Sequence, residues 1–416
     1  MERIKAFFSL PFWRNQWTLF SLWMLMVAIS VGLHMHNFNN FLIYKYTFWH
    51  AYEGRSIFLN HGDHFDVNHY GPLFSLIIAP FAVVPSLWVG VALWHLALAL
   101  LLWWAIRQST LTAEQQVVVI WLTAHEMLNA LGMSQFNVAT AAMILLTFTA
   151  VSRGRNGWAA FWIVVGVLVK VYGIVGLVFI LFSDNKKRFL MWLALWTAVL
   201  FVLPMPFFGA EYVVGQYVEW WHCLGEKGAE NLLSDFQNIS LLGMVRKIGY
   251  ALSAGLPAYY EVFETAGKEY DAGNWWMATW SDLWLILPAM LYSALPFLRF
   301  RQYRHPAFQL MCLALVLMFV NIFSTGAENS SYIISMLGVA IWFIAVPWQR
   351  SRLDWCLLIF CFILTSLSST DLFPGDMRTY VIRAFSLKAL PVVLIWLKLV
   401  WEMTTRDYSR PQPSLT

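Results

Sequence analysis

Apolar stretches recur along this 416-residue chain and are separated by short basic turns alternating with long acidic, aromatic loops. Hydrophobic residues make up 60% of the chain and charged residues only 12%. A soluble fold of this length has no core large enough to enclose so much apolar surface. Many of the stretches approach the roughly 20 residues that a membrane-spanning helix needs. The pattern therefore predicts an all-α polytopic membrane protein, with residues 1–416 forming one membrane domain.

The apolar stretches give about twelve candidate spans: 17–34, 72–106, 115–130, 135–151, 157–169, 171–183, 188–208, 281–298, 306–323, 332–349, 353–369 and 388–402. The stretch 72–106 is too long for one span and contains Pro80 and Pro85, so it is either one kinked span or two spans. Arg155 and Lys186 flank the run 157–183. Basic turns at both ends predict two half-length helices that meet near 170–173.

The basic residues predict the orientation. If 72–106 makes one net crossing, short loops on one side hold sixteen of the 27 basic residues: Arg3, Lys5, Arg14, Arg107, Arg153, Arg155, Lys186, Lys187, Arg188, Arg299, Arg301, Arg304, Arg350, Arg352, Arg406 and Arg410. The positive-inside rule makes this side cytoplasmic. Both termini are then cytoplasmic, with a tail at 403–416, and 17–34 is a retained first span. The outer face receives a first loop at 35–71 and a large loop at 209–280, where Trp-rich segments predict short amphipathic helices.

Composition also excludes some classes of function. The net charge is only +4 and the basic residues lie in turns rather than in a stripe, so nucleic-acid binding has no support. The four cysteines show no CxxC or CxxH spacing, so we interpret them as small core residues. We expect no metal site and no cofactor.

Five motifs follow one another in order along the chain. They are NFLIYKYTFWHAYEG at 40–54, HYGPLFSLIIAPFAVVP at 69–85, GMSQFN at 132–137, VLVKVYG at 167–173 and QNISLLG at 237–243. Together they resemble glycosyltransferase family 87, over about residues 35 to 330. The corresponding family patterns are an acidic loop after the first span, YPPL, GQxN, a helix-breaking Lys and NxSL.

The resemblance implies a GT-C type bundle of about twelve transmembrane helices. It also implies an inverting, metal-independent transfer of a sugar such as mannose from a polyprenyl-phosphate donor. The acceptor would be a lipid or glycan on the outer face of the bacterial inner membrane. Membrane lipids are the other expected partners.

Two positions depart from the family pattern. Family members carry a catalytic Asp about 14 residues before the loop glycine, and this chain has Asn40 there. An amide does not accept a proton near neutral pH. The YPPL motif is altered at Gly71. Either another carboxylate acts as the base, or the chain binds polyprenyl lipid without catalysis.

Three carboxylates are candidate catalytic groups, and each has a simpler interpretation. Asp66, in the first outer loop, is our main substitute for the missing base. Glu328 lies in a tight polar turn between two spans, where it could equally be a solvated loop charge. Glu126 lies at the outer end of a span, where a charge faces a cavity or a partner, and Lys170 is the alternative partner.

The predicted substrate-binding residues share hydrogen-bonding or cationic side chains and an outer location: Asn40, Asp63, His69, Gln135, Asn137, Lys170, Asn238 and Arg246. Lys170 is flanked by apolar residues, so its ammonium requires a counter-ion, and we favour the donor phosphate. Arg246 is a second phosphate candidate. Helix capping is the simpler interpretation of Asn137.

A transporter or lipid scramblase is the alternative class. In such a protein Glu126 and Lys170 would form a gated pair within the membrane. Transporters of this kind usually have related halves. The sequence shows no internal repeat, and we therefore favour the glycosyltransferase.

Overall fold

The computed structural model describes residues 11–33 and 38–409, and within them all regular secondary structure is helical. This agrees with the predicted all-α class. Contacts between Cα atoms divide the chain into two compact units, Met1–Trp221 and His222–Thr416. Each unit is described separately below.

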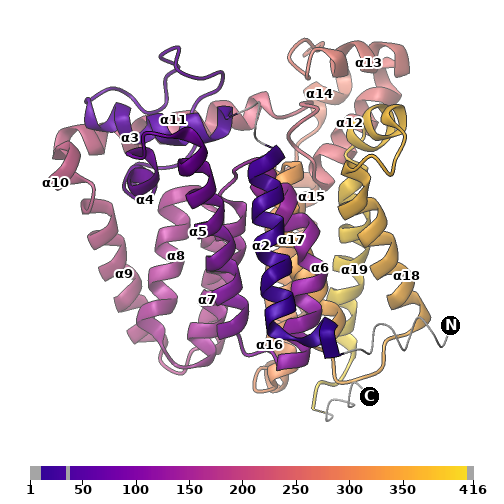
Figure 1. The fold of residues 1–416 in the computed structure, drawn as a ribbon. Helices are drawn as coiled ribbons and strands as arrows, with labels where there is room; N and C mark the ends of the chain where they lie inside the picture. The colour runs from indigo at the N-terminus through magenta and orange to yellow at the C-terminus, as the bar shows by residue number, and fades with distance from the viewer. Residues whose placement is uncertain (1–10, 34–37, 410–416) are drawn as a thin grey trace. The chain divides into compact units, whose positions relative to one another are not determined.

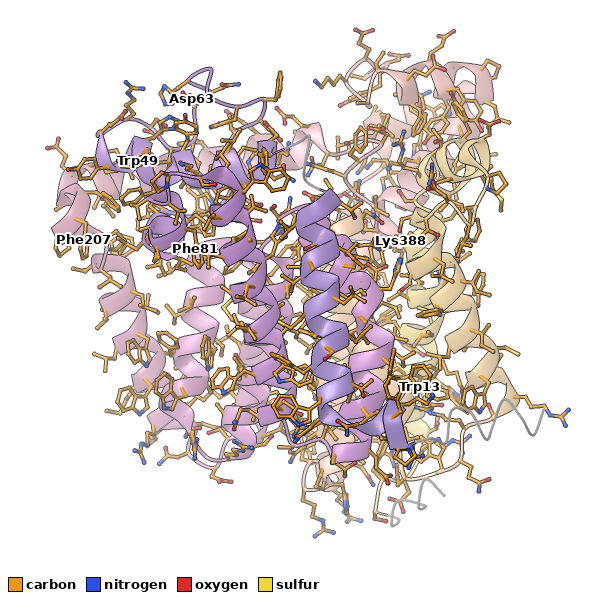
Figure 2. The ribbon with its side chains drawn as sticks, in the orientation of Figure 1. Trp13, Trp49, Asp63, Phe81, Phe207 and Lys388 are labelled. Carbon is orange, nitrogen blue, oxygen red and sulfur yellow. The ribbon has the colours of Figure 1, made fainter. Side chains whose placement is uncertain are left out.

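The first unit contains η1 (Pro11–Arg14), α2 (Gln16–Leu33), α3 (Asn39–Tyr52), α4 (Leu73–Ala82), α5 (Leu87–Gln108), α6 (Ala113–Gly132), α7 (Asn137–Ser152), α8 (Asn156–Lys170), η2 (Tyr172–Phe182), α9 (Lys186–Val202), α10 (Met205–Phe208) and most of α11 (Ala210–Glu230). Helix α2 packs on α5 and α6, and α7 packs on α5 and α8 (Figure 1). Trp13 and Asp63 lie at opposite ends of these helices (Figure 2). The first outer loop thus belongs to one end of the bundle and η1 to the other.

The stretch 72–106 forms two helices, and whether it crosses the membrane once or twice stays a prediction. Helix α4 contains Pro80 and ends at Ala82, and α5 begins at Leu87 after Ser86, whose hydroxyl accepts a hydrogen bond from the Val89 N–H. With ten residues, α4 is about 15 Å long, only half the thickness of the hydrocarbon core.

Helix α8 and η2 form an antiparallel hairpin. The chain breaks at Val171, where φ is +49°. A Cβ on Gly173 would lie 2.6 Å from the Gly166 backbone, so the two segments touch where neither has a side chain. At the other end the Ser183 hydroxyl donates to Asn156 Oδ1 at 3.0 Å. The chain therefore returns to the side from which it came, as the basic turns at both ends predict.

The second unit contains α12 (Leu241–Ala254), α13 (Leu256–Glu264), α14 (Trp275–Thr279), α15 (Leu283–Ala294), η3 (Leu295–Leu298), η4 (Phe300–Gln302), α16 (Pro306–Ile322), η5 (Asn329–Ser331), α17 (Tyr332–Ile344), α18 (Arg352–Cys361), η6 (Phe362–Ser366), η7 (Leu367–Ser369), η8 (Met377–Arg383), η9 (Leu387–Ala389) and α19 (Leu390–Thr405). Its core is the pair α16 and α17, with α19 packed on α16. Helices α12 to α14 pack together in the predicted large outer loop, where short helices are expected, although the preceding α11 has 21 residues.

The number of membrane crossings stays a prediction. Among the described residues, four helices are long and apolar enough to cross alone, or five if the bent pair Met377–Arg383 and Leu387–Thr405 counts as one span. Seven other apolar helices have 10–17 residues. A polytopic membrane protein is thus supported, without the count of about twelve.

Four charged side chains, of which Asp354 and Glu402 are buried, link α18 and α19 within the second unit. Arg350 Nη1 lies 3.2 Å from Glu402, and Lys398 Nζ lies 3.1 Å from Glu402 and 3.2 Å from Asp354. The Trp342 indole also donates to Glu402 at 3.0 Å. Two cations and two anions balance one another here, so the helix ends are joined by a neutral network.

The cysteines agree only in part with their expected role. Cys223, Cys312 and Cys361 are buried, whereas Cys356 is exposed on α18. In a lipid-facing helix an exposed apolar side chain needs no further explanation.

Candidate functional site

Lys170 is the last residue of α8, at the turn of the hairpin. Its ammonium donates to the Asn137 side-chain oxygen at 2.7 Å. It also lies 5.6 Å from the centroid of the Tyr70 ring and 5.1 Å from that of Tyr172. Aromatic faces and an amide oxygen both stabilise a cation. The break at Val171 thus places a half-buried ammonium among aromatic and amide groups.

Gln135 joins this group from the turn between α6 and α7. Its side-chain oxygen accepts hydrogen bonds from Tyr70 at 2.8 Å and from Tyr44 at 3.2 Å. The two tyrosines come from different segments, Tyr44 from α3 and Tyr70 from the residues before α4. We call Tyr44, Tyr70, Gln135, Asn137, Lys170 and Tyr172 the Lys170 cluster. Four of the five motifs, those around 44, 70, 135 and 170, meet in it.

Gly71 explains how the altered YPPL motif fits against α8. Its N–H donates to the Val169 carbonyl at 3.0 Å. An added Cβ would lie 2.1 Å from the Leu168 carbonyl oxygen and 3.0 Å from the Trp220 ring. Proline in this position has no N–H to donate. The departure from the family pattern therefore gives a direct backbone link to the end of α8, beside Lys170.

The first outer loop holds the other predicted residues of this unit. The Asn40 amide donates to the Met133 carbonyl at 2.8 Å, two residues before Gln135. Asp66 is exposed, and its carboxylate accepts from the Val67 N–H. The His69 carbonyl accepts from the Trp220 indole at 2.9 Å. Asn40 is thus bonded to the segment that carries Gln135 of the Lys170 cluster. Asp66, in contrast, is on the surface.

Asp63 pairs with a buried histidine. Its carboxylate lies 3.1 Å from His50 Nε2, and the His61 ring packs edge-on against His50 with centroids 4.3 Å apart. Burial lowers the pKa of His50, and the Asp63 hydrogen bond opposes that effect. Burial also lowers the pKa of His64. In residues 11–33 and 38–409, no three His, Cys, Asp or Glu side chains are arranged to hold a metal ion.

Glu126 is fully buried on α6. Its carboxylate accepts from the Asn129 amide at 3.2 Å, one helical turn away. A buried carboxylate in a membrane helix is costly to maintain. Glu126 therefore keeps its place as a candidate functional residue of the first unit.

In the second unit, the QNISLLG motif lies against the Glu328 turn. The Ile239 N–H donates to the Ala327 carbonyl at 2.8 Å, and the Tyr332 hydroxyl donates to the Ile239 carbonyl at 2.7 Å. Asn238 is buried with φ of +53°, and a Cβ on Gly243 would lie 1.7 Å from its carbonyl oxygen. These contacts hold two distant segments together.

Glu328 is half-buried and folds over its own turn. The Ser330 hydroxyl donates to its carboxylate at 3.2 Å, and its N–H donates to the Ser331 hydroxyl at 3.1 Å. Arg246, the second phosphate candidate, forms an ion pair with Asp282 at 2.8 Å and is buried. A phosphate at Arg246 would have to share it with that carboxylate.

Sequence reasoning did not single out Tyr44, Lys247 or Lys388 as functional. Tyr44 lies inside the first motif, which was the available signal. Lys247 is completely buried, and Lys388 is 3% exposed at the start of the last apolar stretch. A lysine inside an apolar segment is the signal that identified Lys170, and it applies equally to Lys388.

Comparison with known protein families gives a match over a large part of the chain. The sequence model described as glycosyltransferase family 87 matches residues 68–325, which is more than half of the chain. This range contains four of the five motifs, and it covers Lys170 and the QNISLLG segment. No curated protein sequence matches the chain. Four motifs converge on the Lys170 cluster and the fifth anchors the second unit, within a helical membrane protein that belongs to glycosyltransferase family 87.

Proposed function

We propose that this protein is an inverting, metal-independent glycosyltransferase. It moves one sugar, mannose, from a polyprenyl phosphate to a lipid or glycan acceptor at the outer face of the bacterial inner membrane. The observation that carries this proposal is the Lys170 cluster, in which four family motifs supply a cation, two amides and three phenol groups. Membership of a glycosyltransferase family supports sugar transfer in general.

The cluster suits a phosphate-linked sugar. When the bond between the anomeric carbon and the phosphate oxygen breaks, negative charge accumulates on the departing lipid phosphate. The Lys170 ammonium stabilises that charge more strongly as it develops, which lowers the barrier. Gln135 and Asn137 hydrogen-bond sugar hydroxyls, and Tyr70 offers a ring face and a hydroxyl.

A carboxylate is required on the acceptor side. The acceptor hydroxyl attacks the anomeric carbon, its proton passes to the carboxylate, and the lipid phosphate leaves with the bonding electrons. A general base of this kind contributes about 10² to 10⁴ in rate. Asn40 does not accept the proton. Asp66, Glu126 and Glu328 are the three candidates, and we favour Asp66 because its loop adjoins the altered position.

The direct test uses purified protein in nanodiscs with radiolabelled polyprenyl-phosphate mannose and a lipid extract from a bacterial envelope. Wild type should form a labelled product without added metal. Lys170→Met should lose about 100-fold or more in transfer, because it removes the cation at the leaving group. Lys187→Met, at an exposed lysine, is the matched control and should keep activity within about twofold.

The base is identified with Asp66→Asn, Glu126→Gln and Glu328→Gln. One of the three should lose about 10² to 10⁴ in transfer while the protein still enters the membrane and binds donor. Full activity of Lys170→Met would end the assignment of the leaving-group cation. Movement of donor lipid across the bilayer without sugar transfer would instead favour a scramblase.

A further inference from the structure

Three short segments of the second unit meet in one buried polar region: 237–240, 327–332 and 386–388. The first two are joined by Ile239 and Tyr332, as described above. The third follows η8, and its first residue, Ser386, has φ of +55° and no exposed surface. We call this third segment the brace.

The brace is attached to the QNISLLG segment through Ser386. Its hydroxyl donates to the Asn238 carbonyl at 3.1 Å and accepts from the Lys247 ammonium at 2.9 Å. Lys247 also donates to the Gln237 carbonyl at 3.3 Å. A hydroxyl that both donates and accepts in a buried site fixes its backbone strongly. Ser386 therefore connects two segments that are about 150 residues apart.

The brace is attached to the Glu328 turn through Lys388, which Figure 2 labels. Its ammonium donates to the Asn329 carbonyl at 3.2 Å and also to the Asn329 side-chain oxygen. The ammonium lies 4.8 Å from the centroid of the Tyr332 ring. Asn329 directly follows Glu328, and Tyr332 begins α17. The Lys388 side chain thus contacts both ends of the short helix η5.

The family match ends at residue 325, so both the Glu328 turn and the brace lie beyond it. We propose that Lys388 is a positioning residue: by holding Asn329 it fixes the direction of the Glu328 carboxylate during sugar transfer. The inference rests on the proposed function and concerns Glu328 as one of its three candidate bases, whose place in the reaction the Glu328→Gln variant tests separately. A displacement of about 1 Å at a reacting group lowers the rate around 100-fold. Holding the carboxylate in place therefore offsets the free-energy cost of burying the Lys388 ammonium.

The first measurement requires no activity. Amide hydrogen exchange across 324–332 should become about tenfold faster or more in Lys388→Met, because the turn loses its bonds to the ammonium. Exchange across 137–152 of the first unit should stay unchanged. Lys388→Arg keeps the charge and the donors and should restore protection. Lys187→Met serves again as the matched control.

The second measurement is kinetic. Lys388→Met should lower kcat about 10- to 100-fold and leave KM for polyprenyl-phosphate mannose within about threefold. Asn329→Ala removes the side-chain bond of this contact and leaves the bond to the Asn329 backbone carbonyl. The double variant should then be no slower than the slower single variant, since both substitutions break one interaction. If Lys388→Met does not accumulate, Asn329→Ala alone tests the contact.

The outcomes separate the two proposals. If wild type transfers no sugar, the proposed function fails, and the exchange experiment still decides whether Lys388 holds the turn. If Lys388→Met folds with unchanged exchange and unchanged kcat, the positioning role is overturned. A rise in KM with kcat retained would also overturn it, because that result assigns Lys388 to donor binding.

Discussion

His50 and His64 make the first outer loop sensitive to acid. Burial lowers the pKa of both side chains, and His61, Asp63 and Asp66 are the charged or titratable groups around them. Below about pH 6.5 the unfolded chain takes up protons that the folded loop resists, so stability is present above that pH and is lost as pH falls through the folded pKa values.

We therefore expect the loop to loosen between pH 7.5 and pH 5.5, measured by hydrogen exchange over 55–70. His50→Gln should weaken this dependence, because glutamine does not titrate. His222→Gln, at an exposed histidine, is the control and should preserve it. Identical protection factors, which correct for the intrinsic exchange rate at each pH, at both pH values in wild type would contradict the prediction.

Gly71 tests how tightly the altered motif packs. Gly71→Ala should destabilise the protein by about 1–3 kcal/mol or more, because its Cβ would overlap the Leu168 carbonyl oxygen. Thermal unfolding in detergent measures the loss. Gly132→Ala, where an added Cβ meets nothing within 4 Å, should unfold like wild type. Equal melting temperatures for both variants would show that the backbone contact is absent.

At the scale of elements, packing holds Val171 in a backbone conformation that valine disfavours. A β-branched side chain with φ of +49° is strained, and such strain costs about 1–3 kcal/mol. Val171→Gly should therefore raise the melting temperature by a few degrees, because the strain relieved exceeds glycine's entropic cost of about 0.5–1 kcal/mol. Val169→Gly, within regular α8, should lower it.

A substitution in the charge network between α18 and α19 should lower stability, in contrast to Val171→Gly. Glu402→Ala leaves Arg350 and Lys398 with one carboxylate between them in a buried site, which should cost about 3–5 kcal/mol. The same thermal measurement detects it. Arg352→Ala, at an exposed arginine of α18, should change stability by less than about 0.5 kcal/mol.

The sequence predicted elements better than contacts. The spacing of the apolar stretches, the proline positions and the basic turns were sufficient to predict an all-helical chain and the break near Lys170. These features act on the backbone within a few residues. The bond from Lys170 to Asn137 and the ion pair of Arg246 with Asp282 depend on which faces meet, and one sequence carries no direct signal for that. The assignment of Arg246 to phosphate stays a prediction for the same reason.

For the whole molecule, orientation is the open expectation that is simplest to measure. In a Cys356→Ser background, Asp63→Cys should react with a membrane-impermeant thiol reagent added to intact spheroplasts. Arg153→Cys should react only after permeabilisation, because the positive-inside rule places its turn in the cytoplasm. The removal of Cys356 is needed because it is exposed, whereas the other three cysteines are buried. The reverse labelling pattern would invert the proposed orientation.

The hairpin of α8 and η2 also affects the number of times that the chain crosses the bilayer before α9. Because Asn156 and Ser183 lie together, the two segments contribute an even number of passages, and α9 starts on the side where α8 started. Removing the pair entirely, with Arg155 joined to Lys186, would leave the parity of every later segment unchanged.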